Sequence, residues 1–526
     1  MSTKPDQEAA VDMNEVKEDH IGYVEPTTPA VSDMRDGELG AAAKPLPKSL
    51  QKLQHAELWL NNKLGIEQQG IELLRESDKR PPSLWNAFLI WSSLNVHFGQ
   101  VPIGLVGAEF GLSLGWNLAA IIGGIAAGAL LSAFCATLGP KLGLRQIVSS
   151  RFSFGIWGAR LCAVLNVIVL GGFSIIGSIV TGGILDAVSN YTIGIELGII
   201  LVAILAYVVS FFGFRVIHQV EKYYWIFTAI LMFVLIGQSA SYVDASIPTY
   251  GTDSLAIAGT FLTIFAVNAS VGVGWSTMAS DYMIHYHAST PSWKIYFINY
   301  AGIVVFTSFP TIVGALIGNI AFANPNSSFA AAYASHGIGG LLLELYHPVG
   351  WAKTAMVLLS FSTVAGGAAL SYSSGLSLQL LSSYSRAVPR FIWSFLWVLV
   401  TTIIAVAGRN DLSSFVTSLI SIVGYWIVPF AVILLLEDQV FRRRRGYVVD
   451  DWNTPSRLPW GVAAVFALLA GYLCGGLPGM AQTWFVGPVA AYFGPYGGDV
   501  GLYMSAAISA VVYLAARPIE MHYAGR

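Results

Sequence analysis

The chain has 526 residues, a formal net charge of −2 and a mean hydropathy of +0.62, and only 11% of its residues are charged. About 25% of the residues of an average soluble domain are charged, so this composition excludes a soluble globular protein and indicates a polytopic protein of the lipid bilayer. The small net charge gives no indication of nucleic-acid binding, and we expect no nucleic-acid partner.

Residues 1–80 form the first segment and differ in composition from the rest of the chain. They are acidic, rich in Pro, Ala and Lys, and contain no apolar stretch that could serve as the hydrophobic region of a signal peptide. We therefore predict a disordered N-terminal tail in the cytoplasm.

Apolar runs of about 18–25 residues follow one another from Leu84 onward, each long enough to cross about 30 Å of hydrocarbon. They predict an all-α transmembrane domain over residues 81–518 with about twelve helices, followed by a cytoplasmic tail over residues 519–526. The predicted spans are residues 85–112, 116–136, 160–187, 194–213, 222–240, 254–279, 296–322, 351–383, 391–408, 414–436, 459–475 and 502–517.

Two of these spans, the first and the sixth, are interrupted. Within residues 95–104 of the first, Gly99 loosens the helix and Pro102 removes a backbone donor. Within residues 266–282 of the sixth, three small residues and Trp275 stand where the helix should continue. An unpaired backbone amide in hydrocarbon costs several kcal/mol, so such breaks face protein, water or a ligand. Breaks in matching positions of two halves are typical of the midplane site of a secondary transporter.

The distribution of Lys and Arg predicts the orientation in the membrane. The loops after spans two, four, eight and ten are basic, whereas the intervening loops are nearly free of Lys and Arg, with Arg409 as the exception. By the positive-inside rule the basic loops and both termini are cytoplasmic. The basic residues are Lys141, Arg145, Arg151, Arg215, Lys222, Arg386, Arg390 and the run 442–445.

The three cysteines, Cys135, Cys162 and Cys474, fall in or beside predicted spans. Their positions favour small apolar packing residues over a disulfide, and no Cys/His spacing of a metal site occurs, so we expect neither metal nor cofactor. The spans also lack the paired carboxylates, HExxH pair or Ser/His/Asp set that a membrane-embedded enzyme would need, and we expect no enzymatic activity.

Three strings of residues indicate a family. They are LGPKLGLRQIVSSRFSFG at 138–155, SFFGFRVIH at 210–218 followed by EKYYW at 221–225, and GWSTMASDY at 274–282. Together they resemble the fungal purine–cytosine permeases of the nucleobase–cation symporter-1 family, and the resemblance covers residues 81–518.

The resemblance implies a five-plus-five inverted repeat of the leucine-transporter type with two extra helices. In that fold spans one and six break around the substrate, and spans three and eight complete the site. The implied function is secondary active import of a nucleobase of the purine or cytosine type, or of a related small heterocycle.

Trp275 is the first candidate for substrate binding. An indole beside unwound backbone offers a stacking face to a flat heterocycle while the free amides read its polar edge; the other interpretation is a Trp packed between helices. Gly274 adjoins it, Ser93 aligns with a site serine of span one or is a small packing residue, and Asn95 is a further candidate at the break.

Two departures from the family bear on the substrate. Span three has Phe173 and Gly177 where the family carries a Trp and an Asn, and span eight has Leu370 at the last of three family amides. Losing the amides should cost a few kcal/mol for a purine or cytosine unless the site has been rebuilt. A vitamin-B6-like pyridine, which some fungal members carry, is therefore the alternative substrate.

The resemblance also bears on the coupling ion. Sodium sites in this fold use Ser or Thr hydroxyls about five residues before the span-eight amide, and those positions are Val364 and Ala365, so we predict proton coupling. Candidate proton carriers are His97, Glu109 and Asp281. The alternative for His97 is a hydrogen bond to a neighbouring carbonyl, and the alternative for Asp281 with Arg145 is a cytoplasmic gate or a fold-stabilising ion pair.

The tail leaves one further class open. A transporter-like nutrient sensor would keep the site and add a signalling tail, although tails of this kind also serve sorting and turnover. For a carrier that imports nutrients we expect the plasma membrane.

Overall fold

The computed structural model describes residues 72–525 except 213, 252 and 495, and it describes no side chains for residues 212–222 and 383. The predicted N-terminal tail thus lies outside the described residues apart from its last nine positions, 72–80. Within the described part of the chain, eleven helices are long and apolar enough to cross a membrane. A twelfth span is divided between two shorter helices, α3 and α4, so the twelve predicted spans are all found.

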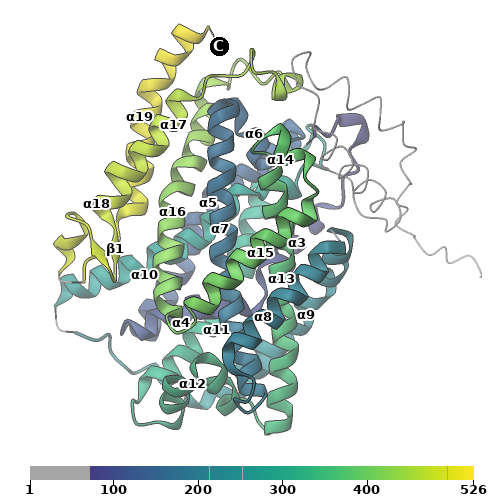
Figure 1. Ribbon diagram of the computed structural model, residues 1–526. Helices are drawn as coiled ribbons and strands as arrows, with labels where there is room; N and C mark the ends of the chain where they lie inside the picture. The colour runs from purple at the N-terminus through teal and green to yellow at the C-terminus, as the bar shows by residue number, and fades with distance from the viewer. Residues whose placement is uncertain (1–71, 213, 252, 495, 526) are drawn as a thin grey trace, which may run out of the picture. The chain divides into compact units, whose positions relative to one another are not determined.

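The helices that form the spans follow the predicted order (Figure 1). They are α3 (Leu84–Asn95), α4 (Val101–Glu109), α5 (Leu114–Leu142), α7 (Arg151–Val188), α8 (Gly194–Phe212), α9 (Phe214–Ser239), α10 (Ser254–Gly274), α11 (Ser292–Ala323), α13 (Val349–Gln379), α15 (Arg390–Ala407), α16 (Leu412–Leu436), α17 (Val462–Ala470) with α18 (Leu477–Gly479), and α19 (Gly501–Ala524).

Shorter elements lie in the connections between spans. The α6 (Gln146–Ser149) and α14 (Ser383–Ala387) helices lie at one end of the bundle and α12 (Ser328–Leu345) at the other (Figure 1). A two-stranded antiparallel hairpin, β1 (Ala481–Gln482) and β2 (Phe485–Val486), precedes α19. The sequence did not predict α12, because a search for apolar runs of membrane length passes over a helix that does not span.

The predicted C-terminal boundary at residue 518 is not a structural boundary. The α19 helix continues through Pro518 to Ala524, and the carboxylate of Glu520 accepts a hydrogen bond of 2.7 Å from the Gly461 amide. Residues 519–524 therefore continue the last helix.

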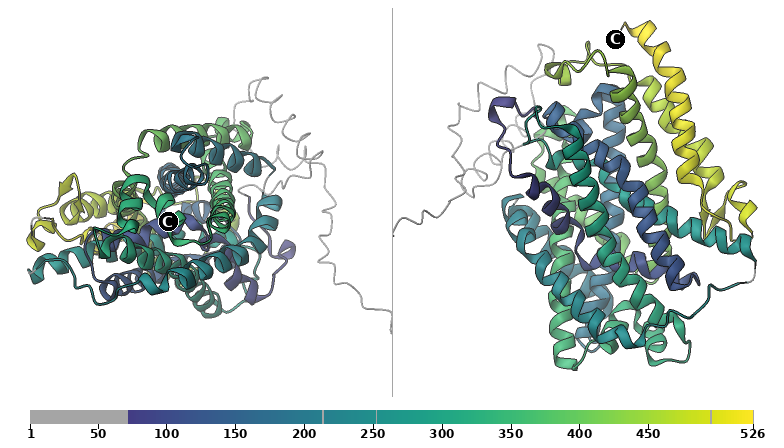
Figure 2. Two further views of the ribbon diagram at one scale, coloured as in Figure 1. Left: turned by 90° about the horizontal axis from the view of Figure 1, so that it is seen from below. Right: turned by 180° about the vertical axis from the view of Figure 1, so that it is seen from behind.

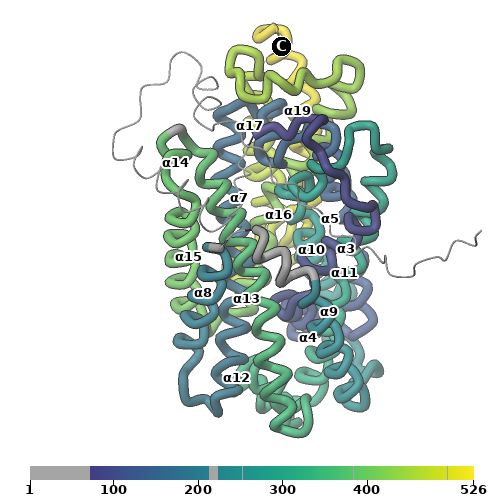
Figure 3. Tube along the Cα trace, turned by 90° about the vertical axis from the view of Figure 1, so that its right-hand side faces the viewer, coloured from purple at the N-terminus to yellow at the C-terminus, as the bar shows by residue number. Residues whose placement is uncertain are grey.

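Close backbone approach brings the broken first span against span seven. A Cβ atom added to Gly104 would lie 1.8 Å from the Thr311 carbonyl oxygen, and one added to Gly314 would lie 1.9 Å from that of Val101. Only glycine fits at either position, so α4 and α11 pack with their backbones in contact. On another side of the bundle α13 runs beside α8 and α9 (Figure 3), and α17 and α19 form a pair at the edge against α16 (Figure 2).

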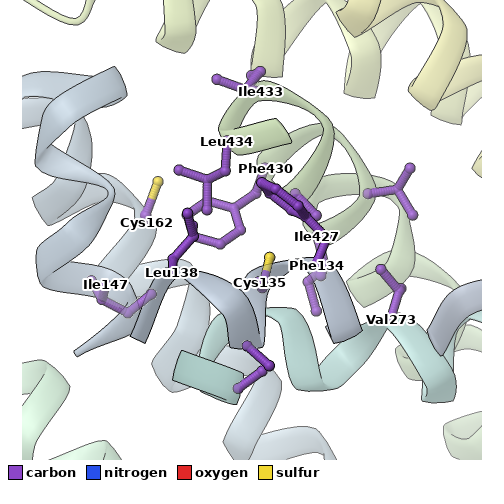
Figure 4. Packing of buried hydrophobic residues seen from close by; sticks show 14 of the residues in the cluster. Phe134, Cys135, Leu138, Ile147, Cys162, Val273, Ile427, Phe430, Ile433 and Leu434 are labelled. Atoms are coloured by element: carbon purple, nitrogen blue, oxygen red, sulfur yellow. The ribbon is translucent and has the colours of Figure 1, made fainter. Parts of the chain in front are cut away.

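The largest hydrophobic cluster joins α5, α6, α7, α10 and α16. Cys135 and Cys162 lie in it as free thiols, among side chains such as Leu138, Phe430 and Leu434 (Figure 4). Both are apolar packing residues, as predicted. Cys474 is also a free thiol, and it is exposed.

A buried ion network closes the end of α16. The Glu437 carboxylate accepts hydrogen bonds from Arg517 at 2.9 and 3.0 Å, from Arg442 at 2.8 Å and from the Tyr513 hydroxyl at 2.8 Å. The side chains of Arg517 and Glu437 are only 2% and 1% exposed. At the opposite end, Arg409, the exception among the weakly charged loops, pairs with Glu196 at 2.8 Å.

Candidate functional site

The first span breaks directly after Asn95. Val96 and His97 leave the helical conformation, residues 98–100 form a 3₁₀ turn, and α4 begins at Val101. Pro102 stands in the first turn of α4, where a missing N–H costs nothing because the first four amides of a helix have no intrahelical partner. The predicted break is confirmed.

The sixth span breaks at the predicted glycine. The α10 helix ends at Gly274, residues 275–277 form a 3₁₀ turn, Met278 is non-helical, and residues 279–282 form a second 3₁₀ turn. Residues 275–282 therefore follow a tighter path than an α-helix, which leaves several α-helical hydrogen bonds unmade.

One cavity lies between these two breaks and the middle of spans three and eight. Six residues singled out from the sequence line it, and they come from all four elements. They are His97, Phe173, Gly177, Gly274, Trp275 and Leu370. The cavity is thus formed by four segments that are far apart in the sequence and that only the fold brings together.

Aromatic and aliphatic side chains form most of the lining. Trp275 and Phe173 both line the cavity, and the Phe173 ring lies close to Gly274, since a Cβ atom added there would lie 3.6 Å from its Cζ atom. Flat apolar faces with a few polar atoms are typical of sites for planar ligands.

The polar side of the cavity comes from His97, Gln100 and Thr363. His97 Nδ1, Gln100 Oε1 and Thr363 Oγ1 are buried and have no hydrogen-bond partner among the residues that the structure describes. An unmet buried polar atom costs about 1–3 kcal/mol, which a bound ligand or water can recover. The sequence did not single out Thr363, nor the hydroxyl residues Ser174, Ser178, Ser373, Thr401 and Thr402, which also line the cavity.

Two of the predicted substrate residues do not line the cavity. Ser93 donates its hydroxyl to the Ile90 carbonyl in its own helix at 2.9 Å. Asn95 is fully buried and bonds the Trp275 ring nitrogen at 3.0 Å, so it lies behind the indole. Both side chains are occupied by the protein.

Gly177 is explained by helix packing. A Cβ atom added there would lie 2.9 Å from Thr363 Cγ2, so the absence of a side chain lets α7 approach α13. The resemblance to the permeases implies that Gly366 takes the place of the first of their three span-eight amides, and an added Cβ atom there would be 3.8 Å from the His97 ring.

Glu109 and Asp281, the other two predicted proton carriers, lie away from the cavity. Glu109 ends α4, with one carboxylate oxygen buried and unbonded within the described structure, and Ser413 and Tyr333 lie near it. Asp281 accepts a hydrogen bond of 2.6 Å from the Gln146 amide at the start of α6, and Arg145 lies 3.6 Å from its other oxygen. Asp281 thus pairs with Arg145, and whether the pair acts as a gate or only stabilises the fold stays a prediction.

The segment before span one closes the same end of the bundle. The Leu74 amide donates to the Gly143 carbonyl at 2.9 Å, and Lys79 Nζ donates to that of Pro140 at 2.7 Å. Glu76 pairs with Lys79 and with His287, and the hydrogen bond from Lys79 lowers the pKa of Glu76, which keeps the carboxylate charged.

Hydroxyl groups lie beside the break in span one, although positions 364 and 365 carry none. The Phe98 amide donates to Ser362 Oγ at 3.1 Å, and Thr363 follows. The preference for proton coupling stays a prediction, and the hydroxyls that lie beside the break are two positions before Val364 and Ala365.

Comparisons with known proteins agree with this architecture. A sequence-family profile described as "Permease for cytosine/purines, uracil, thiamine, allantoin" matches residues 75–501. A vitamin B6 transporter of Saccharomyces cerevisiae is 28% identical over 98% of this chain and 99% of its own length. A purine-cytosine permease of Emericella nidulans is 31% identical over 88% of this chain and 90% of its own.

A solved structure shows the same fold. It is a nucleobase–cation symport-1 transporter in a closed conformation with bromovinylhydantoin bound, 14% identical, with a TM-score of 0.62 over 87% of this chain and 96% of that one. The chain accordingly has the predicted all-α, five-plus-five inverted repeat with two further helices. From the profile match over most of its length, the chain belongs to the family of permeases for cytosine/purines, uracil, thiamine and allantoin.

Proposed function

We propose that the protein imports a small planar heterocycle of the nucleobase type, which binds between the breaks of spans one and six. The observation that carries this proposal is the cavity itself: Trp275 and Phe173 offer ring faces, and three buried polar atoms beside them lack partners within the described structure. Stacking of a base on an aromatic ring contributes about 1–3 kcal/mol and does not depend strongly on which base is bound.

A vitamin-B6-like pyridine is the second candidate, and the absence of the family amides favours it. With Gly177 and Leu370 in spans three and eight, Gln100 is the single carboxamide that lines the described cavity. His97 lies beside Gly366, so an imidazole and hydroxyl groups replace bidentate amides. An imidazole and hydroxyl groups make single hydrogen bonds, which match the hydroxyls of a substituted pyridine better than the paired donor and acceptor of a base edge.

Uptake in cells that lack their own carriers tests both candidates. Radiolabelled adenine, guanine, hypoxanthine, cytosine, pyridoxine and thiamine are each offered, and unlabelled compounds compete. Saturable uptake of at least one base supports the first candidate, and saturable uptake of pyridoxine alone selects the second. No uptake of any of the six contradicts the proposal.

Proton coupling is the proposed energy source. His97 is the sole His, Asp, Glu, Lys or Arg among the described residues that line the cavity, and its Nδ1 atom is free to exchange a proton with a ligand or water. A protonophore should therefore collapse uptake. The hydroxyls of Ser362 and Thr363 make sodium the competing ion, and a strict sodium requirement would defeat the assignment.

Restoring an amide in span eight should favour nucleobases. Leu370→Asn should tighten adenine or cytosine binding by about twofold to tenfold, because one hydrogen bond contributes about 0.5–1.5 kcal/mol. The measurement is the inhibition constant of each base, with Leu370→Met as the control that keeps size without the amide. Equal constants for the two variants would show that position 370 does not read the base. Gly177→Asn is not a clean counterpart, since its Cβ atom would press on Thr363.

The plasma membrane, with both termini in the cytoplasm, is the proposed location. The described basic loops lie at the end of the bundle that holds α6 and α14, and basic loops favour the cytoplasmic side (Figure 1). The strap formed by residues 72–80 and the Arg145–Asp281 pair would then close the inner side of the site.

A further inference from the structure

Asn95 holds Trp275 by a hydrogen bond, and both lone pairs of its amide oxygen are used within the protein. Its Oδ1 atom accepts from Trp275 Nε1 at 3.0 Å and from Thr307 Oγ1 at 2.9 Å, and its Nδ2 atom donates to the Trp91 carbonyl at 3.0 Å. An amide oxygen has two lone pairs, and both are used here. Asn95 is also fully buried, so its side chain acts within the protein.

Trp91 fixes the tilt of the same indole. The two rings meet edge to face at a centroid distance of 5.2 Å and an angle of 75°. Trp91 is itself anchored, because its Nε1 atom donates to Asn299 Oδ1 at 2.8 Å. The indole N–H lies in the ring plane, so the bond to Asn95 sets the in-plane position of Trp275 and the contact with Trp91 sets its tilt.

These hydrogen bonds connect span seven to the ring of Trp275. Thr307 and Asn299 both belong to α11, and within the described structure none of the cavity-lining residues comes from that helix. Any shift of α11 against α3 would pull on Asn95 and so turn the ring of Trp275. The Asn95 carbonyl also accepts the His97 amide at 2.9 Å, which ties the second polar group of the site to the same residue.

We infer that Asn95 and Thr307 are positioning residues for Trp275: they fix the plane of its indole and thereby set the width of the slot that accepts the heterocycle. The inference rests on the proposed function, in which the Trp275 ring stacks on the substrate. It predicts that the hydroxyl of Thr307, which touches no ligand, affects substrate affinity and selectivity.

Thr307→Val is the direct test, because it removes the hydroxyl and keeps the shape. The KM of uptake should rise by about threefold to tenfold, while the maximal rate per carrier at the surface stays within about twofold. The inhibition constants of one-ring and two-ring heterocycles should change by different factors. Thr307→Ser should restore the native values, and Thr307→Ala replaces the valine variant if that protein does not reach the surface.

Thr311→Val is the matched control on the same helix. The Thr311 hydroxyl is buried too, but it donates to the Thr307 carbonyl at 2.8 Å within α11, so its loss should leave KM and selectivity unchanged. Trp275→Phe removes the ring N–H, and in that background Thr307→Val should add little to KM. If Thr307→Val raised KM by the same factor in the Trp275→Phe background as in the native protein, the positioning role would be overturned.

The outcomes separate this inference from the proposed function. If Trp275→Ala transports every heterocycle normally, the stacking role fails and the proposed site fails with it. If Trp275→Ala loses uptake while Thr307→Val and Thr311→Val both keep the native KM, the proposed site is supported. That result overturns the positioning role alone.

Discussion

Replacement of Trp275 by alanine is expected to remove most high-affinity uptake while the protein still reaches the membrane. The variant loses a stacking face worth about 1–3 kcal/mol, so the affinity should fall by about fivefold to 100-fold. The side chain is partly exposed and its ring lines the cavity, the position that the proposed stacking requires. The measurement is KM and surface abundance in the same cells.

Trp275→Tyr and Trp91→Phe serve as its controls. Tyrosine keeps an aromatic face, so Trp275→Tyr should retain part of the affinity that alanine loses. Trp91 is fully buried outside the cavity lining and acts on the ligand only through the tilt of the Trp275 ring, so Trp91→Phe should raise KM less than Trp275→Ala does. Native KM in Trp275→Ala would place Trp275 among the packing residues.

Loss of Arg517 is expected to destabilise the folded protein most strongly among the ion pairs. Arg517→Met leaves the Glu437 carboxylate buried with Arg442 as its remaining cation, and breaking a buried pair costs about 3–5 kcal/mol. The fall in the midpoint of thermal unfolding in detergent, and reduced surface abundance, measure the effect.

Arg409→Met is the matched control, because it removes the same kind of side chain from an exposed pair. Arg409 and Glu196 are 30% and 44% exposed, and such pairs contribute about 0–1 kcal/mol. Equal losses of thermal stability in the two variants would show that burial does not set the strength of the Glu437 network.

The spans and both breaks were predictable because their signals are local. Membrane length, apolarity and the Gly and Pro residues at 99, 102 and 274 are visible in short windows of the sequence. Phe173 and Leu370 were also placed correctly in the cavity, through a resemblance that aligns spans three and eight.

The remaining features depend on partners far away in the chain. Asn95 resembled a ligand contact until the fold brought Thr307, 212 residues later, to its amide oxygen. Gly177 was interpreted as the loss of a family amide, yet a side chain at this position would press on its neighbour Thr363, so helix packing explains the glycine. The sequence analysis did not single out Ser362, because counting positions along one span does not show which turn of that span meets Phe98.

We propose that this chain drives a small heterocycle across the membrane through the cavity at the two breaks. Purified protein in liposomes, with an imposed pH gradient and no sodium, should accumulate the labelled heterocycle found by the uptake screen. Trp275→Ala liposomes should accumulate little of it. Absence of accumulation under pH and sodium gradients alike, with protein correctly inserted, would contradict the claim.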